Sequence, residues 1–132
     1  MNQGRIKLLE DYFKMNITPV LVKDIPSEIF DGGVILKNDI LIDDLTGHYE
    51  GTSYLPPSWY DEVINKSKHG NVLLVIENIN DIPSEEQKKF VEILKYRKVS
   101  TFPLPDKCLI VVTSSNSGNS INEDVYTLLA QI

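Results

Sequence analysis

The stretch Val72-Leu73-Leu74-Val75-Ile76-Glu77-Asn78 decides the fold class. Five apolar residues stand in a row, and polar side chains follow at once. A strand that is buried on both faces has this pattern, and such strands usually belong to parallel sheets. A second apolar run, Leu109–Val112, ends in the same way before the polar segment Thr113–Asn116. We therefore expect two strands of a parallel sheet, each with polar residues at its carboxyl end.

Helical segments separate the expected strands. Residues 3–15 and the segment that begins at Pro57 carry apolar side chains at helical spacing. Ser84 and Ser120 each stand three residues before Gln or Glu, which is the capping-box spacing of a helix start. Strands that alternate with helices indicate βαβ units with right-handed crossovers and a parallel sheet covered on both faces. In such sheets, functional side chains gather at the carboxyl ends of the strands.

Two more short strands are expected before the long apolar run. Val20–Val22 is one, and Val34–Leu36 is the other. Between them, Pro26-Ser27 is expected to open a turn or a short helix. Ile40–Ile42 is also strand-like, so that it forms with Val34–Leu36 either a hairpin or one irregular strand. We expect an ordered loop over residues 43–56.

Length and composition limit the class of protein. The chain has 132 residues, of which 42% are hydrophobic and 24% charged, so a single globular domain over residues 1–132 is expected. No apolar run approaches the roughly 20 residues of a membrane span, and residues 1–16 lack the apolar core of a signal peptide. We therefore expect a cytoplasmic protein. The one cysteine, Cys108, begins the second apolar stretch and is expected to be a buried, inert thiol.

The charge balance argues against general nucleic-acid binding. The net charge is −6, whereas neutralising phosphates requires clustered Lys and Arg. A basic cluster does lie within residues 88–98, but Glu85, Glu86 and Glu92 interleave with it. We interpret this cluster as a solvated helix face, with a nucleic-acid patch as the alternative.

No metal centre or catalytic group is indicated by residue spacing. His48 and His69 are the only histidines, and neither has Cys or His at metal-ligand spacing. The adjacent acids Asp43–Asp44 and Glu85–Glu86 are typical of groups that complement a helix dipole. Trp59 is expected in the core, and the alternative is an aromatic side chain that binds a partner.

The order of these segments resembles the core of AAA+ ATPases, and in particular their MoxR-like branch. Leu73–Asn80 is similar to a Walker B strand, in which four apolar residues precede Asp-Glu, and Pro83–Leu94 resembles the helix that follows it. Leu109–Asn116 resembles the sensor-1 strand, which ends in Asn. The resemblance covers roughly residues 40–120, and three further segments are similar to that branch: Asp43–Gly47, Tyr54–Trp59 and Phe102–Pro105.

The resemblance implies an α/β fold with a P-loop-NTPase-like core that lacks the family's helical lid. It implies three layers, with helices on both faces of a mostly parallel sheet. Four strands are expected in the order 2-3-4-1, and the family's fifth strand is expected beyond the end of this chain. Glu77 and Asn116 are then expected at the same edge of the sheet.

The phosphate-binding loop of the family is missing. An AAA+ ATPase holds phosphates with the P-loop G-x-x-x-x-G-K-[ST], whose backbone amides cradle the oxygens. None of the seven glycines in this chain is followed by Lys. The first expected strand is followed instead by Lys23-Asp24-Ile25-Pro26-Ser27. A carboxylate at Asp24 repels phosphate, and Pro26 has no N–H group to donate.

The residues that would promote hydrolysis are also altered. Glu77 stands where the family has the Asp linked to Mg²⁺, and Asn78 stands where it has the Glu that activates water. An amide cannot accept a proton, and loss of general-base help typically costs about 10²–10⁴-fold in rate. No arginine follows Arg97 to serve as an arginine finger. Asn116 matches the sensor-1 residue that orients water in the family, and its simpler interpretation is a polar strand end.

We therefore expect a non-hydrolysing, degenerate AAA+-like domain that acts as a protein-interaction or regulatory module. The expected partner is another protein, for which an active AAA+ ATPase is one candidate, and no cofactor or metal is expected. One alternative is a residual ATP-binding subunit of an AAA+ assembly, with Mg²⁺, that uses Glu77, Asn78 and Asn116. The other is a nucleic-acid accessory protein that uses residues 88–98.

Overall fold

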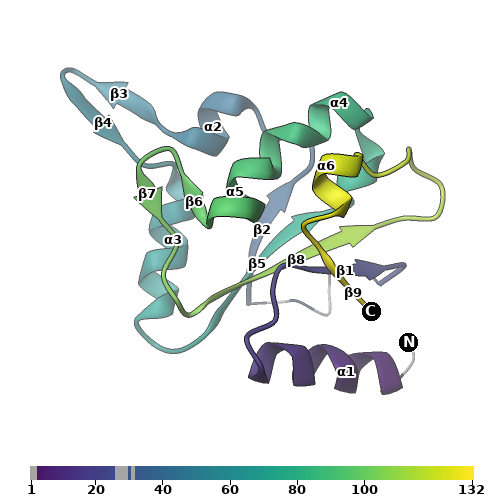
Figure 1. Ribbon diagram of the computed structural model, residues 1–132. Helices are drawn as coiled ribbons and strands as arrows, with labels where there is room; N and C mark the ends of the chain where they lie inside the picture. Colours follow the sequence, from purple (N-terminus) through teal and green to yellow (C-terminus); the bar gives the residue numbers. More distant parts are fainter. Residues whose placement is uncertain (1–2, 26–29, 31) are drawn as a thin grey trace.

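The computed structural model describes residues 3–25, 30 and 32–132. Its centre is a sheet of five parallel strands in the order β2-β5-β8-β1-β9 (Figure 1). Because every neighbouring pair is parallel, the carboxyl ends of all five strands lie at the same edge of the sheet. The strands are Val20–Lys23 (β1), Val34–Lys37 (β2), Val72–Glu77 (β5), Cys108–Ser114 (β8) and Ala130–Gln131 (β9).

The strand order confirms one expectation and corrects another. The four strands expected from apolar runs stand in the order 2-3-4-1. The expectation that the fifth strand lies outside the chain is wrong, because Ala130 and Gln131 pair with Val20 and Leu21 of β1. The edge of β1 is therefore covered by the chain itself. A two-residue strand has no periodicity, and for this reason the sequence does not reveal it.

Helices cover the sheet on both faces, as the strand and helix pattern predicts. Figure 1 shows α1 on one side of the sheet and α5 and α6 on the other. The helices are α1 (Gln3–Lys14), α2 (Ile42–Thr46), α3 (Ser58–Ser67), α4 (Ser84–Gln87), α5 (Val91–Tyr96) and α6 (Glu123–Tyr126). Two 3₁₀ turns, η2 (Ile79–Asp81) and η3 (Lys88–Phe90), complete the helical segments that connect β5 to β8.

The two faces of the sheet form two separate core clusters. One joins Val20 and Val22 of β1 to Leu9 of α1. The other joins alternate residues of β2, β5 and β8 to buried side chains of α3, α5 and α6. The connections from β2 to β5, β5 to β8 and β8 to β9 all step in one direction across the sheet. Their helices therefore share a face, as crossovers of one hand require.

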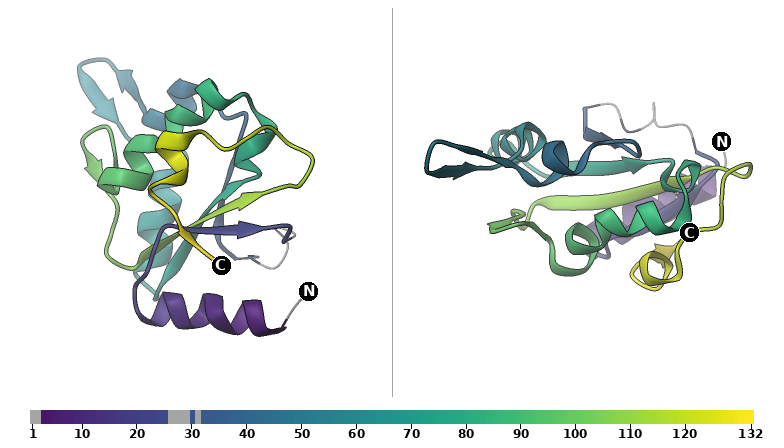
Figure 2. Two further views of the ribbon diagram at one scale, coloured as in Figure 1. Left: turned by 45° about the vertical axis from the view of Figure 1, so that its right-hand side comes forward. Right: turned by 90° about the horizontal axis from the view of Figure 1, so that it is seen from above.

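The segment between β2 and α3 differs from what the sequence predicts. Ile40–Ile42 is no strand: Ile40 closes a turn through its N–H group, which donates to the carbonyl oxygen of Lys37, and Ile42 begins α2. Residues 43–56 are mostly regular structure, because α2 is followed by an antiparallel hairpin of His48–Glu50 (β3) and Ser53–Leu55 (β4). Figure 2 shows this hairpin projecting from the body of the molecule. A smaller hairpin follows α5 and joins Lys98–Val99 (β6) to Phe102–Pro103 (β7).

Both expected capping boxes are wrong. Pro83 precedes the first turn of α4, and the side chain of Gln87 is fully buried, where it bonds to Ile82, Ser120 and Asn122. The last helix is capped by Asn122, whose side chain accepts a hydrogen bond from the N–H of Asp124. Tertiary bonds across the α4–α6 contact therefore replace the local bonds that the spacing predicts.

The structure also tests the expected burial of Trp59 and Cys108. Trp59 is buried, as expected, and its Nε1 donates to the carbonyl oxygen of Leu45 at 3.0 Å. Cys108 is buried as well, and desolvation raises the pKa of its thiol to about 11. No helix within the described ranges is long and apolar enough to cross a membrane. The turn or helix expected at Pro26-Ser27 lies outside the described residues.

Candidate functional site

The predicted site residues stand at the carboxyl edge of the sheet. Glu77 is the last residue of β5 and pairs in register with Lys37 of β2. The neighbouring strand β8 ends at Ser114, two residues before Asn116. The structure thus brings Glu77 and Asn116 to one edge, as expected from the resemblance. Their role in binding a nucleotide stays a prediction.

Asn78 links three strands at this edge. Its backbone is left-handed, with φ 46°, and its N–H group donates to Oγ1 of Thr113 at 2.8 Å. Its carbonyl oxygen accepts a hydrogen bond of 2.9 Å from Nδ2 of Asn38, which follows β2. The main chain of Asn78 is therefore held from both neighbouring strands. At the position that the resemblance assigns to a water-activating Glu, the backbone of Asn78 serves as a structural junction.

Asn80 is one of the polar residues that follow the first apolar run, but the sequence analysis assigns it no role. It is 5% exposed, and its side chain pairs with the backbone of Ser115 on both sides. Nδ2 donates to the carbonyl oxygen of Ser115 at 2.7 Å, and Oδ1 accepts from its N–H group at 2.9 Å. The carbonyl oxygen of Asn80 in turn accepts from the N–H group of Asn119 at 2.6 Å.

Gly118 permits the close approach of this loop to Asn80. A Cβ atom at Gly118 would lie 2.5 Å from the carbonyl oxygen of Asn80 and 2.7 Å from its Nδ2 atom. Real Cβ contacts of this length do not occur, so the position requires glycine. Asn80 and the Gly118 backbone together hold residues 114–119 against the end of β5. The sequence signal for this contact is an Asn after one strand and a Gly after the next. This signal is too weak to identify the contact from the sequence alone.

Asn116 itself lies at the exposed part of this loop. Its side chain has no hydrogen-bond partner within the part of the chain that the structure describes. The neighbouring Ser115 hydroxyl instead donates to Asp81 Oδ1 at 3.0 Å. Asn116 is thus free to meet solvent or a ligand, whereas Ser115 before it is held by Asn80 and Asp81.

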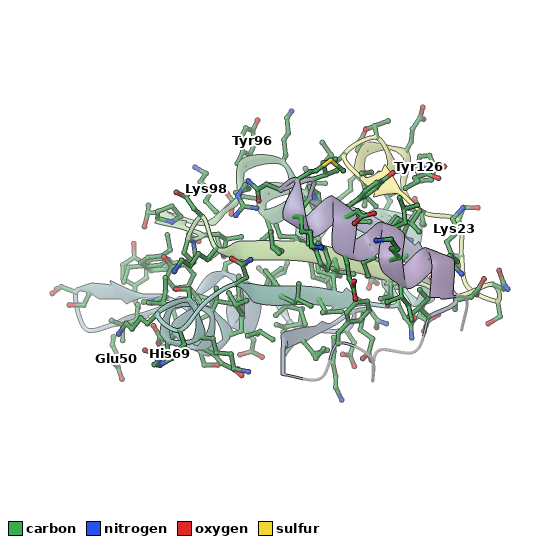
Figure 3. The ribbon with its side chains drawn as sticks, turned by 90° about the horizontal axis from the view of Figure 1, so that it is seen from below. Lys23, Glu50, His69, Tyr96, Lys98 and Tyr126 are labelled. Atoms are coloured by element: carbon green, nitrogen blue, oxygen red, sulfur yellow. The ribbon has the colours of Figure 1, made fainter. Side chains whose placement is uncertain are left out.

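The first residue after β1, Asp24, offers no free amide to a phosphate group. Asp24 has left-handed backbone, with φ 57°, and its N–H group donates to the carbonyl oxygen of Ser114 at 3.0 Å. The carbonyl oxygen of Lys23 accepts a bond of 2.7 Å from the Arg5 guanidinium. The first amide after the strand, that of Asp24, is therefore already bonded within the protein. Figure 3 shows Lys23 at the opposite end of the molecule from Glu50 at the β3–β4 hairpin.

Comparison of the chain with protein-family models gives no match, and a search of the curated proteins gives none either. The functional interpretation accordingly depends on this chain's own residues.

The basic cluster of residues 88–98 contains cations that bond to the backbone and others that are exposed. Lys89 Nζ donates to the carbonyl oxygen of Ile40 at 2.8 Å, and the Arg97 guanidinium donates to the carbonyl oxygen of Cys108 at 2.7 Å. These two cations hold the fold together, whereas Lys98 is exposed and projects from the surface beside Tyr96 (Figure 3). The cluster is thus only in part a solvated face, and it presents fewer free cations than its sequence indicates.

The histidines and the adjacent acid pairs form no catalytic or metal-binding group within the described residues. His48 and His69 are both exposed, and no group of three or more potential metal ligands occurs among the residues that the structure describes. Asp43–Asp44 and Glu85–Glu86 lie in the first turns of α2 and α4. That placement is the one expected for acids that complement a helix dipole.

Proposed function

We propose that this chain is a non-hydrolysing AAA+-like domain that acts by binding another protein. The observation that carries the proposal is the state of the carboxyl edge of the sheet. The strand order is the one that the resemblance implies, yet two backbone amides at the edge where a nucleotide would sit already bond within the chain. The amides of Asp24 and Asn78 bond to Ser114 and Thr113.

This arrangement opposes phosphate binding for two physical reasons. A phosphate group needs several unpartnered N–H donors that converge on one point, and the amide of Asp24 is already bonded within the sheet. The carboxylate of Asp24 also adds negative charge at the point where phosphates would arrive. Glu77 could still meet a cation, but no lysine of a P-loop accompanies it.

The strand β9 bears on where a partner would bind. A sheet edge left open beside β1 would be a natural place for a partner strand, but β9 already pairs there. We therefore place the proposed partner, for which an active AAA+ ATPase remains one candidate, on another part of the surface. This placement directs attention to exposed apolar residues.

Calorimetric titration with ATP and Mg²⁺ at millimolar nucleotide tests the proposal. We expect no heat of binding from the wild type or from the Glu77→Ala variant, and no phosphate release from either. Micromolar binding that is lost in Glu77→Ala but kept in Glu50→Ala would contradict the proposal. Glu50 is a suitable control because it is an exposed carboxylate on the distant hairpin.

A further inference from the structure

A cavity of about 580 Å³ lies between the segment that follows β2 and the segment that begins at α4. One wall is Asp39–Ile42, and the other comes from Glu85, Glu86, Lys88 and Lys89. Leu41 and Ile42 are 69% and 54% exposed. Adjacent aliphatic side chains with this exposure form an apolar surface that nothing in the described part of the chain covers, and such surfaces often mark interaction sites.

The apolar wall is held in place from beneath. Ile40 packs against the larger core cluster, and its carbonyl oxygen accepts the hydrogen bond from Lys89 Nζ at 2.8 Å. Leu41 and Ile42 then stand at the start of α2, whose Leu45 is buried. The two exposed side chains are therefore presented on a fixed backbone, which lowers the entropy that binding would cost.

The rim of this groove is acidic. Asp43 and Asp44 are exposed in the first turn of α2, and Asp39, Glu85 and Glu86 are exposed beside them. The groove also holds two lysines: Lys88 Nζ lies 3.3 Å from Glu85, and Lys89 donates to the carbonyl oxygen of Ile40 while it keeps its charge. The five acids outnumber the two lysines, so the net charge around the apolar wall is negative.

We infer that this groove, defined by residues 39–42 together with Glu85, Glu86, Lys88 and Lys89, binds a basic amphipathic segment of a partner protein. Apolar side chains of that segment would cover Leu41 and Ile42, and its Lys or Arg side chains would meet the acids of the rim. Helix-in-groove recognition uses this combination of an apolar stripe and charged flanks. The inference rests on the proposed function, because it names the surface and the kind of partner for the same module.

Other occupants fit the groove less well. Small-ligand sites bury roughly 70–90% of their ligand, whereas the apolar wall here extends beyond the cavity into open solvent. The acidic rim repels nucleic-acid phosphates. A two-fold contact with a second copy would place the acidic rim against itself.

A designed peptide tests the inference without knowledge of the natural partner. The probe is a synthetic amphipathic helix of Leu and Lys, with Leu at positions i, i+3, i+4 and i+7, labelled for fluorescence anisotropy. The control probe has the same Leu pattern with Glu in place of Lys. We expect the Lys peptide to bind, the Glu peptide to bind at least about tenfold more weakly, and added salt to weaken the Lys peptide.

Variants of exposed residues locate the binding. Leu41→Ser is expected to weaken the Lys peptide at least about tenfold, which is the factor that loss of one well-buried Leu contact produces. Met15→Ser is the matched control, because Met15 is 61% exposed on a different surface, and it is expected to leave binding unchanged. Circular dichroism and thermal unfolding confirm that both variants fold.

Several results would overturn the inference. They are no binding of the Lys peptide, equal binding of the Glu peptide, or equal weakening by Leu41→Ser and Met15→Ser. Self-association that Leu41→Ser abolishes would overturn it too, since the occupant would then be a second copy. If the protein binds neither ATP nor the peptide, the inference about the groove is wrong while the proposed function stands. If it binds ATP through Glu77, the proposed function fails whatever the peptide does.

Discussion

Two regions at the carboxyl edge of the sheet differ in which side chains they bury and which they expose. After β5 and β8, polar side chains turn inward and satisfy one another, as Asn80 does with Ser115. After β2, aliphatic side chains at Leu41 and Ile42 turn outward with nothing in the described structure over them. The polar segments after β5 and β8 are bonded to each other, whereas the apolar segment after β2 is open to solvent. For this reason the proposed binding surface is the apolar segment.

The largest expected effect is the difference in stability between alanine variants of Leu45 and Leu41 in that segment. Leu45→Ala should destabilise the protein by about 2–5 kcal/mol, because Leu45 is 1% exposed and its removal leaves a cavity. Leu41→Ala should change the free energy of unfolding by less than about 0.5 kcal/mol, because its side chain is mostly in solvent. Urea unfolding measures both values. Equal losses would mean that Leu41 packs in solution and that the groove is not open.

A second pair of variants tests the polar edge. Asn80→Ala removes both side-chain bonds to Ser115 and should cost about 2–4 kcal/mol, because it leaves backbone groups without partners. Asn116→Ala is the control on the same loop and should cost less than about 0.5 kcal/mol. If urea unfolding shows the reverse order, Asn116 has the structural role and Asn80 does not.

A third variant measures how tightly the loop closes on Asn80. Gly118→Ala should cost about 1–3 kcal/mol, because its Cβ would collide with Asn80 and move the loop. Ser117→Ala is the matched control, since Ser117 is exposed and adjacent. Thermal unfolding of the two variants gives the comparison. A harmless Gly118→Ala would show that residues 114–119 stand further from β5 than described.

The smallest effect concerns pH at the opposite edge of the sheet, where β8 begins at Cys108. Burial raises the pKa of this thiol from 9.0 to about 11, so the folded state keeps its proton at a pH where the unfolded state has lost it. Stability from this group is fully present below pH 9 and is lost as the pH rises toward 11. The difference in unfolding free energy between wild type and Cys108→Ala should therefore shrink over this range. A constant difference would mean that the thiol is solvated.

Local patterns predicted some elements well and others badly. Val72–Ile76 and Leu109–Val112 were predicted as central strands, because a continuous apolar run reports burial on both faces. The β3–β4 hairpin was missed, since its strands have only three residues each and little alternation. The two capping boxes failed because Gln87 and Asn122 found tertiary partners that the local spacing does not contain.

The sequence by itself determined the parallel α/β sheet and the placement of Glu77 and Asn116 at one edge. Apolar runs and the alternation of strands and helices are local properties, and they suffice for this. Only the tertiary structure decided that Asn80 holds the edge together, that β9 completes the sheet and that Leu41 remains uncovered. The bonds of Asn80 reach residues 35 and 39 positions away, and β9 exists only because β1 offers it an edge. Contacts between residues so distant leave no periodic signal in the chain.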